Sequence, residues 1–355
     1  MMSLSSIEQY LQKSALVRAF LLLLAFIATA DVHAAADPLF ETSEILDVTI
    51  TGPLATLVRE RPTDDYLPGL FRYTDANGSD VEFDLQLRAR GHFRHKNCDF
   101  PPLRLNYKKS QTDATLFDKQ DKLKLVVHCD DSVRYEQTIL REYLAYRILN
   151  AISDTSFRVR LLRVTYIDNE NQLKEKQRFG FLIEHQDRLA HRMNRNLLDV
   201  ERMAISSIQP DQLNLTSIFE YLIGNTDFSP VTGAPGASCC HNYVLFGNDA
   251  DPVIAIPYDF DQSGFVNAPY AQPDQRFRIR SVRQRVYRGR CVNNDYVDVS
   301  LQKFRDGRAT IEKLIESQIG LNPRTRKSLV AYVDGFYKLI DDPKQVERRI
   351  IGQCI

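Results

Sequence analysis

A strict alternation of apolar and polar side chains over residues 81–90 constrains the fold more than any other feature of the sequence. In this segment, VEFDLQLRAR, every odd-numbered residue is apolar and every even-numbered residue is charged or an amide. Successive side chains of a strand point to opposite faces, so the alternation predicts a β-strand with one buried face. Asn77-Gly78 just before it predicts a hairpin turn, because both residues tolerate positive φ. Further strands are predicted at about 103–107 and 122–128.

The periodicity then changes from that of strands to that of helices. Apolar residues three and four apart predict a helix over about 136–152, and two more strands are predicted at 157–168 and 178–185. The second half is predicted to contain helices at 215–223 (ended by Gly224), 301–319, from Asn322-Pro323 onward and over 343–354, with short strands at 243–246 and 253–258. This order predicts an α+β protein with two lobes. A β-rich N-lobe with one inserted helix would span residues 37–188, and a mainly helical C-lobe would span residues 189–355.

The overall charge narrows the classes of partner. The chain has 355 residues and 46 basic against 46 acidic side chains, so its formal net charge is zero. A neutral chain lacks the positive charge of a protein that coats nucleic acid, and we expect no nucleic-acid partner. Apolar residues make up 43% and charged residues 26%, the usual balance of a folded globular protein.

Residues 1–36 have the pattern of a secretory signal peptide. The apolar run AFLLLLAFIATA follows Lys13 and Arg18, and small residues at cleavage spacing come after it. The alternative is a membrane anchor, but twelve apolar residues rise only about 18 Å as a helix, less than the roughly 30 Å of a bilayer core. We therefore expect an exported protein, periplasmic or extracellular after cleavage, without a transmembrane anchor.

Six cysteines follow the predicted signal peptide: Cys98, Cys129, Cys239, Cys240, Cys291 and Cys354. An even number of cysteines in an exported chain favours disulfides. We expect Cys98 to pair with Cys129, and the Cys239-Cys240 pair to bond with Cys291 and Cys354. The alternative, a metal site at Cys239-Cys240-His241, lacks the two-residue spacer of a zinc knuckle and is less favoured.

Four polar residues mark the strongest candidate site. Asp227 follows the helix end at Gly224, Asn242 opens the next predicted strand, and Asp259 and Asp261 follow the strand after that. Because strand, turn and strand return the chain to one edge, these four side chains are expected to meet. Their oxygens suit Mg²⁺, and phosphoryl transfer uses such a set. Taken singly, each of them is more often a local hydrogen-bonding group in a turn.

Several short motifs lie between about Phe83 and Val266, about half the chain. These motifs are Arg88-Ala89-Arg90-Gly91, Phe100-Pro101, Leu140-Arg141, Leu144-Ala145-Tyr146, Gly180-Phe181-Leu182-Ile183-Glu184, Asn225-Thr226-Asp227 and Pro257-Tyr258-Asp259-Phe260-Asp261. With them the segment resembles the spore-coat protein H (CotH) kinases, a secreted and atypical branch of the protein kinases. This resemblance implies a bilobal protein-kinase-like fold that binds Mg²⁺ and ATP and transfers phosphate to a hydroxyl of a protein substrate.

By this resemblance Asp227 is the catalytic aspartate, and Asn242, Asp259 and Asp261 are metal ligands or lie beside the metal. The nucleotide would be bound by Arg90 and Gly91 at a strand end, by Glu142 on the inserted helix and by Glu184 between the lobes. Glu142 would pair with a phosphate-binding cation, although such a residue is more often a solvent-facing helix former.

The sequence departs from the family where the phosphate-binding lysines are expected. Pro102-Leu103-Arg104 replaces the usual lysine pair, so Arg104 or the later Lys108 is the candidate cation. The interval from Asp227 to Asn242 is also longer than usual. The alternative function is therefore a catalytically inactive binding or structural protein of the cell envelope. A metal-dependent hydrolase ranks last, since no nucleophile is evident.

Seven arginines lie between Arg276 and Arg290, with apolar residues among them. One interpretation is a patch for an acidic or phosphorylated partner. The favoured alternative is a half-exposed strand whose arginines face solvent.

Overall fold

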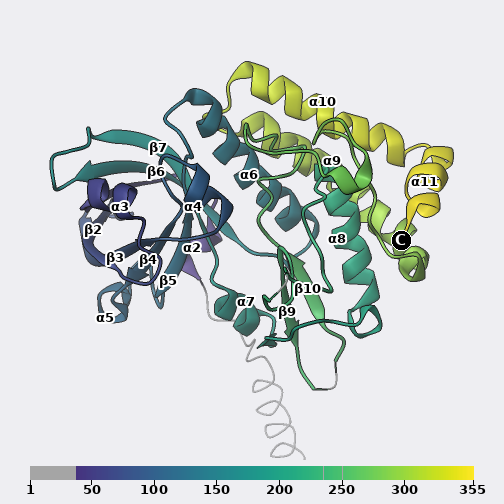
Figure 1. Cartoon of the computed structure of the whole chain (residues 1–355), viewed down its shortest axis with the longest axis horizontal. Helices are drawn as coiled ribbons and strands as arrows, with labels where there is room; N and C mark the ends of the chain where they lie inside the picture. The colour runs from purple at the N-terminus through teal and green to yellow at the C-terminus, as the bar shows by residue number, and fades with distance from the viewer. Residues whose placement is uncertain (1–36, 235, 250) are drawn as a thin grey trace, which may run out of the picture. The chain divides into compact units, whose positions relative to one another are not determined.

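Seven strands of the first half close into a barrel (Figure 1). The computed structural model describes residues 37–234, 236–249 and 251–355, and the predicted signal peptide lies outside these ranges. The strands are β1 (Leu46–Gly52), β2 (Leu67–Thr74), β3 (Asp80–Ala89), β4 (Leu103–Tyr107), β5 (Lys122–Val126), β6 (Val159–Asp168) and β7 (Lys176–Ile183). They are hydrogen-bonded in the order β1-β2-β3-β4-β5-β7-β6, and β6 pairs with β1 in parallel.

The barrel corrects the predicted fold class. A closed seven-stranded barrel followed by helices is not a bilobal protein-kinase-like fold, and that prediction was wrong. Closure depends on the parallel pairing of β1 with β6, in which Leu46 lies beside Leu162. Local periodicity identifies strands, but it does not specify which distant strand completes the ring.

The alternation over residues 81–90 does form a strand with one buried face. Phe83, Leu85, Leu87 and Ala89 of β3 are buried, while the residues between them are exposed or partly exposed. The predicted hairpin is also confirmed, with Gly78 at φ 81° between the paired strands β2 and β3.

Aromatic side chains fill the barrel interior. Phe71, Phe83, Tyr107 and Phe117 are almost fully buried, and the ring centroids of Phe71 and Phe117 are 5.0 Å apart in an edge-to-face arrangement. Rings of this size exclude water from the interior and stabilise the barrel through apolar burial. The barrel is therefore a packed core rather than a channel.

Helix α6 (Val133–Ile152) is inserted between β5 and β6, as predicted, and lies between the barrel and the helices of the second half (Figure 1). These are α8 (Pro210–Ile223), α9 (Val297–Ser317), α10 (Pro323–Ile340) and α11 (Pro343–Arg349). Residues 37–355 form one compact unit, and one apolar cluster joins α6 to β7, α8, α9 and α10.

A second sheet of three antiparallel strands lies in the second half. It consists of β8 (Asn196–Leu198), β9 (Tyr243–Gly247) and β10 (Ile254–Pro257), with β9 in the middle. The remaining helices are short: α2 (Pro38–Glu41), α3 (Leu54–Glu60), α4 (Phe93–Asn97), α5 (Lys109–Thr112), α7 (Gln186–Arg192), η1 (Ile205–Ser207), η2 (Gln275–Phe277), η3 (Cys291–Tyr296) and η4 (Ile351–Gln353). No helix in the described ranges is long and apolar enough to cross a membrane.

One of the three disulfides has the predicted pairing, and the other two do not. Cys98 bonds to Cys129, as predicted. Cys239 bonds to its neighbour Cys240, and Cys291 bonds to Cys354, so the predicted bonds between these two pairs were wrong. Because both sulfurs of the vicinal pair are in a disulfide, they are not thiolate ligands for a metal.

We expect Cys98→Ser/Cys129→Ser to lower the free energy of unfolding by about 3 kcal/mol, since this bond closes a long loop in the unfolded chain. The sequence separation is 31 residues, and both cysteines are buried. Denaturant unfolding measures the change. The matched control is Cys239→Ser/Cys240→Ser, whose bond spans neighbouring residues and restricts the unfolded chain far less. Equal losses in both variants would contradict the expectation.

Candidate functional site

The loop after α8 presents Asp227 to solvent. The helix ends at Gly224, which has φ 65°, and a Cβ at this position would collide with the hydroxyl of Tyr332. Glycine is therefore required both for the left-handed turn and for the close approach. The amide of Asp227 donates to Oδ1 of Asn225 at 3.0 Å, and this contact sets the start of the loop.

Asp227 is held by two side chains from the far end of its loop. Asn242 Nδ2 donates to the Asp227 carbonyl oxygen at 2.6 Å and to its Oδ2 at 3.2 Å. His241 Nε2 lies 2.7 Å from Asp227 Oδ1. Residues 227 and 242 are thus brought together, as the sequence predicted. His241 was not among the predicted site residues, although its position directly before Asn242 was a usable signal.

The end of β10 brings Asp259 to the same place. Pro257 pairs with Tyr243, and the amide of Tyr258 donates to the Asn242 carbonyl oxygen at 3.0 Å. The amide of Asp259 donates to the hydroxyl of Tyr146 on α6 at 2.9 Å. Among the described residues, no group hydrogen-bonds to the Asp259 carboxylate. Its oxygens are therefore available to a ligand.

Asp261 and Glu142 are buried carboxyl groups behind Asp259. Asp261 is 6% exposed and accepts a hydrogen bond from the Tyr270 hydroxyl at 2.9 Å. Burial, followed by the charge of Asp259, raises the pKa of Asp261 to about 7. Burial also raises the pKa of Glu142 well above its usual range, and the charges of Asp261 and Asp259 add to this effect. Both buried carboxyl groups therefore favour the protonated form, and a cation bound beside Asp259 would lower their pKa values.

Glu142 is not a solvent-facing residue. It is 1% exposed, and its Oε2 lies 3.6 Å from Nη1 of Arg94 on the short helix α4. Arg94 is also buried and donates to the carbonyl oxygen of Val127. Sequence reasoning predicted a cation partner for Glu142 but did not identify Arg94, because residues 92–97 show no periodicity that predicts a helix.

Two basic side chains, Lys124 and Arg90, lie near Asp259, and a third, Arg104, lies near Lys124. Arg104 on β4 lies beside Lys124 on β5. Burial, then the charges of Arg90 and Arg104, lowers the pKa of Lys124 to about 7, and Asp259 opposes this shift. Burial also lowers the pKa of Arg90, again opposed by Asp259. Lys124 Nζ lies 4.7 Å from the ring centroid of Tyr258, the residue before Asp259. The cations and the carboxylate thus face one another.

Lys124 is the most important residue that sequence reasoning missed. Arg104 and Lys108 were the predicted phosphate-binding cations. Arg104 lies at the site end of the barrel, but Lys108 is exposed after the end of β4, where α5 begins. Lys124 occupies one position of an alternating strand, and only the pairing of β5 with β4 brings it beside Arg104. Gly91 follows β3 directly with φ 84°, so it turns the chain after Arg90.

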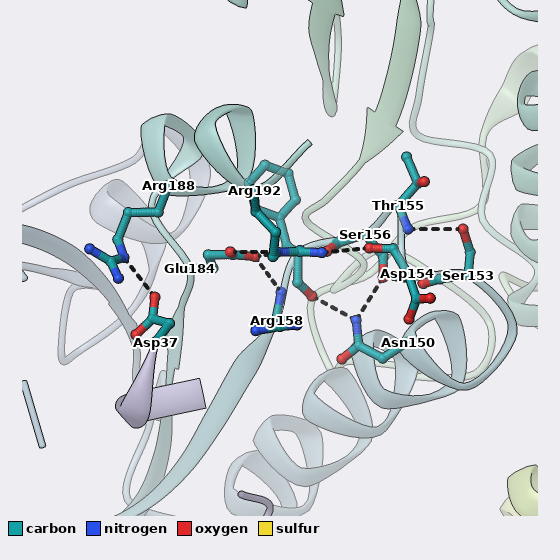
Figure 2. Close-up of polar contacts among 11 residues, drawn as sticks. Asp37, Asn150, Ser153, Asp154, Thr155, Ser156, Arg158, Glu184, Arg188 and Arg192 are labelled. Atoms are coloured by element: carbon teal, nitrogen blue, oxygen red, sulfur yellow. Dashed lines mark hydrogen bonds and ion pairs between the residues drawn. The ribbon is translucent and has the colours of Figure 1, made fainter. Parts of the chain in front are cut away.

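Glu184 is already engaged by other protein groups (Figure 2). Arg192 donates to its Oε1 at 3.1 Å and to its Oε2 at 2.9 Å, and the amide of Arg158 donates to Oε2 at 3.0 Å. The carboxylate is 3% exposed and anchors α7 to the barrel. A small cavity of about 40 Å³ lies nearby, lined by Arg104, Lys124, Phe157, Ile183, Glu184 and Tyr258 among others.

The arginine-rich segment is not the predicted half-exposed strand. Apart from η2, residues 276–290 form neither helix nor strand. Arg288 Nη1 donates to the carbonyl oxygens of Thr226 at 2.8 Å and Phe228 at 2.7 Å, on both sides of Asp227. At least this arginine positions the candidate site rather than facing solvent.

The donor set is compatible with Mg²⁺. The described residues contain no group of three or more His, Cys, Asp or Glu side chains suited to a metal. Mg²⁺ usually binds one or two carboxylates and keeps several waters. The Asp259 carboxylate is available, and Asn242 uses its Nδ2 on Asp227, which leaves its Oδ1 as a second oxygen donor. Asp259 and Asn242 are therefore the residues that would hold Mg²⁺.

Comparison with protein-family models and with curated protein sequences finds no match to this chain. The function must therefore be inferred from the residues of the site.

The contribution of the His241–Asp227 pair to the stability of the fold is expected to depend on pH. The hydrogen bond that the protonated His241 ring donates to the Asp227 carboxylate raises the pKa of His241 above its ordinary 6.5. The folded-state pKa is therefore above the unfolded value, so the pair stabilises the fold fully below about pH 6.5. This contribution is lost as the pH rises through the folded-state pKa.

We expect Asp227→Asn to return the pKa of His241 towards 6.5, as measured by NMR titration of the histidine ring. His185 is the internal control, because burial lowers its pKa and Asp227 is not among the groups that act on it. A His241 pKa that stays raised in Asp227→Asn would contradict the pairing.

Proposed function

We propose that this chain is a phosphotransferase that moves a phosphate group from Mg²⁺-bound ATP, or a related nucleotide, to a hydroxyl of a protein substrate. The observation that carries the proposal is the arrangement around Asp259. Its carboxylate, to which none of the described residues hydrogen-bonds, lies near Lys124 and near the pair formed by Asp227 and Asn242. Positioning and electrostatic stabilisation supply most of the catalysis in phosphoryl transfer.

Each group has a role in this proposal. Asp227 accepts a hydrogen bond from the substrate hydroxyl, orients its oxygen for in-line attack and takes its proton as the new bond to phosphorus forms. Asn242 holds the Asp227 carboxylate in place. Lys124, with Arg90 and Arg104 beside it, binds the phosphate oxygens and stabilises the charge that builds up on the leaving group. Mg²⁺, held by Asp259 and Asn242, would neutralise the phosphates.

Two further features are consistent with this role. Asp261 and Glu142 place two further carboxyl groups near Asp259, both with raised pKa values, and a cation bound at Asp259 would favour their ionised forms. Glu142 pairs with Arg94, so its contribution is to position α4, the helix that follows Arg90 and Gly91. Glu184 is committed to Arg192, and any nucleotide contact there would not use its carboxylate.

The three disulfides support export, because such bonds persist in oxidising compartments. We therefore place the proposed activity in the periplasm or outside the cell. The short motifs around Asp227 and Asp259 are the only support for a relationship to the CotH kinases, and the closed barrel departs from the bilobal fold that this resemblance implied.

One observation favours the alternative, a catalytically inactive binding or structural protein of the cell envelope. His241 bonds to Oδ1 of Asp227, the group that a substrate hydroxyl would need. If His241 keeps this position when a nucleotide is bound, the site binds nucleotide without transferring phosphate. Binding and transfer therefore need separate measurements.

We expect Mg²⁺-dependent ATP binding by calorimetry, together with transfer of labelled phosphate from ATP to an acceptor protein. Asp227→Asn should reduce transfer by about 10²-fold or more and leave binding nearly unchanged, because it removes the proton acceptor. Lys124→Met should reduce transfer by about 10²-fold through lost stabilisation of the phosphates. Asp259→Asn should abolish the dependence of binding on Mg²⁺.

The matched control is Lys108→Met, which removes the same charge from an exposed position, and it should leave both measurements unchanged. ATP binding without transfer in the wild-type protein would favour the inactive alternative. No binding, or equal effects of Lys124→Met and Lys108→Met, would exclude the proposed site.

A further inference from the structure

An open pocket of about 480 Å³ lies among α8, α10, α11 and the segment around residue 285. Four basic side chains line it, Arg283, Arg285, Lys338 and Arg349, with Asp342 as the one acidic side chain among its lining residues. Positive charge therefore predominates in a pocket that is separate from the residues of the proposed phosphotransfer site.

Asp342 carries one negative charge against the four basic side chains that line the pocket. Oδ1 of Asp342 accepts a hydrogen bond from the amide of Lys344 at 2.9 Å and caps the start of α11. Lys338 pairs with Asp334 at 2.8 Å, but the two side chains are 76% and 39% exposed. Exposed pairs of this kind contribute little and exchange readily for a better partner. Lys338 is therefore free to turn towards an anion.

Arg285 is a fixed donor at the base of the pocket. Its guanidinium carbon lies 3.9 Å from the ring centroid of Tyr332, while Nε donates to the Leu222 carbonyl oxygen at 3.0 Å and Nη2 to that of Tyr332 at 2.6 Å. Nη1 makes no hydrogen bond to any described residue and faces Gly335 on α10, where a Cβ would lie 3.7 Å from it. The missing side chain at Gly335 leaves this donor open to a ligand.

Tyr221 adds a second polar group to the pocket wall. It is 4% exposed and lines the pocket, and its hydroxyl has no hydrogen-bond partner among the described residues. Burial raises the pKa of Tyr221, and the charges of Arg285 and Arg349 oppose the shift, so both cations lie near the hydroxyl. The hydroxyl oxygen itself is open to solvent, so it can hydrogen-bond to water or to a ligand in the pocket.

We propose that this pocket binds a small soluble anion that carries two or more phosphate groups. The fixed guanidinium of Arg285, the Tyr221 hydroxyl and the exposed cations Lys338 and Arg349 match the several oxygens and the multiple charge of such a ligand. The pocket size suits a short phosphate chain or a small phosphorylated molecule rather than a protein segment. The arginines of the Arg276–Arg290 segment therefore have two different roles. Arg288 supports the loop of Asp227, whereas Arg283 and Arg285 form part of this pocket.

Calorimetry with tripolyphosphate, without Mg²⁺, tests the proposal on the whole protein. Lys338→Ala/Arg349→Ala should weaken binding by about tenfold or more, because two charge-assisted contacts are lost. Arg324→Ala/Lys327→Ala is the matched control, since both residues are exposed on α10 and do not line the pocket. It should bind like the wild type. Raised salt should weaken binding in every protein that retains the pocket.

Lys124→Met separates this pocket from the proposed nucleotide site and should retain tripolyphosphate binding. Loss of binding in Lys124→Met, or equal affinity in all variants, would overturn the proposal. Citrate that binds as tightly as tripolyphosphate would contradict phosphate recognition. Binding only to vesicles of anionic phospholipid would instead identify a membrane contact and would also overturn it. Failure of the phosphotransfer assay leaves this result unaffected, because the residues tested are different.

Discussion

The burial of α6 between the barrel and the C-terminal helices is the constraint on which the rest of the structure depends. Nearly every central residue of this helix is buried, including Glu142 and Tyr146, so its polar side chains must find partners inside the protein. Gln137 bonds to Gly320 and Asn322 at the start of α10, and Arg141 donates to the carbonyl oxygen of Val266. These contacts hold the second half of the chain against the barrel.

The same helix organises the electrostatics of the candidate site. The hydroxyl of Tyr146 accepts a hydrogen bond from the amide of Asp259. Glu142 adds a buried carboxyl group, which pairs with Arg94. Burying like charges together is costly, and such arrangements are found where a ligand or cation balances them. The fold thus brings the carboxyl groups of Asp259, Asp261 and Glu142 together near the basic side chains of the barrel.

The accuracy of the sequence predictions followed the range of the interaction involved. The strand over residues 81–90, the hairpin at Asn77-Gly78 and the stop at Gly224 were confirmed, because their signals lie within a few neighbouring residues. The pairing of Cys98 with Cys129 was also correct. The pairing of the other four cysteines was wrong, and so were the predicted fold class and the predicted strand at residues 276–290. None of these three features is set by local periodicity.

The residues of the candidate site also fall into those that the sequence indicated and those that it did not. The amino-acid order alone indicated Asp227, Asn242, Asp259 and Asp261, because residues that follow helix and strand ends are placed by local geometry. The cations could not be predicted with equal success. Lys124 is one of two lysines on β5, and only the register with Arg104 distinguishes it. Arg94 lies on a five-residue helix, and only the burial of Glu142 gives it a role.

The sequence by itself determined the helices and strands, the acidic residues at their ends and the abundance of cysteine and arginine. Only the tertiary structure decided that β1 joins β6 to close a barrel, which basic residues face Asp259, and which arginines are anchored and which line a pocket. The physical reason is that periodicity and turn chemistry act over a few residues. Strand pairing, the contacts of buried charges and the Cys291–Cys354 bond instead depend on residues that are far apart in the chain and meet only in the folded protein.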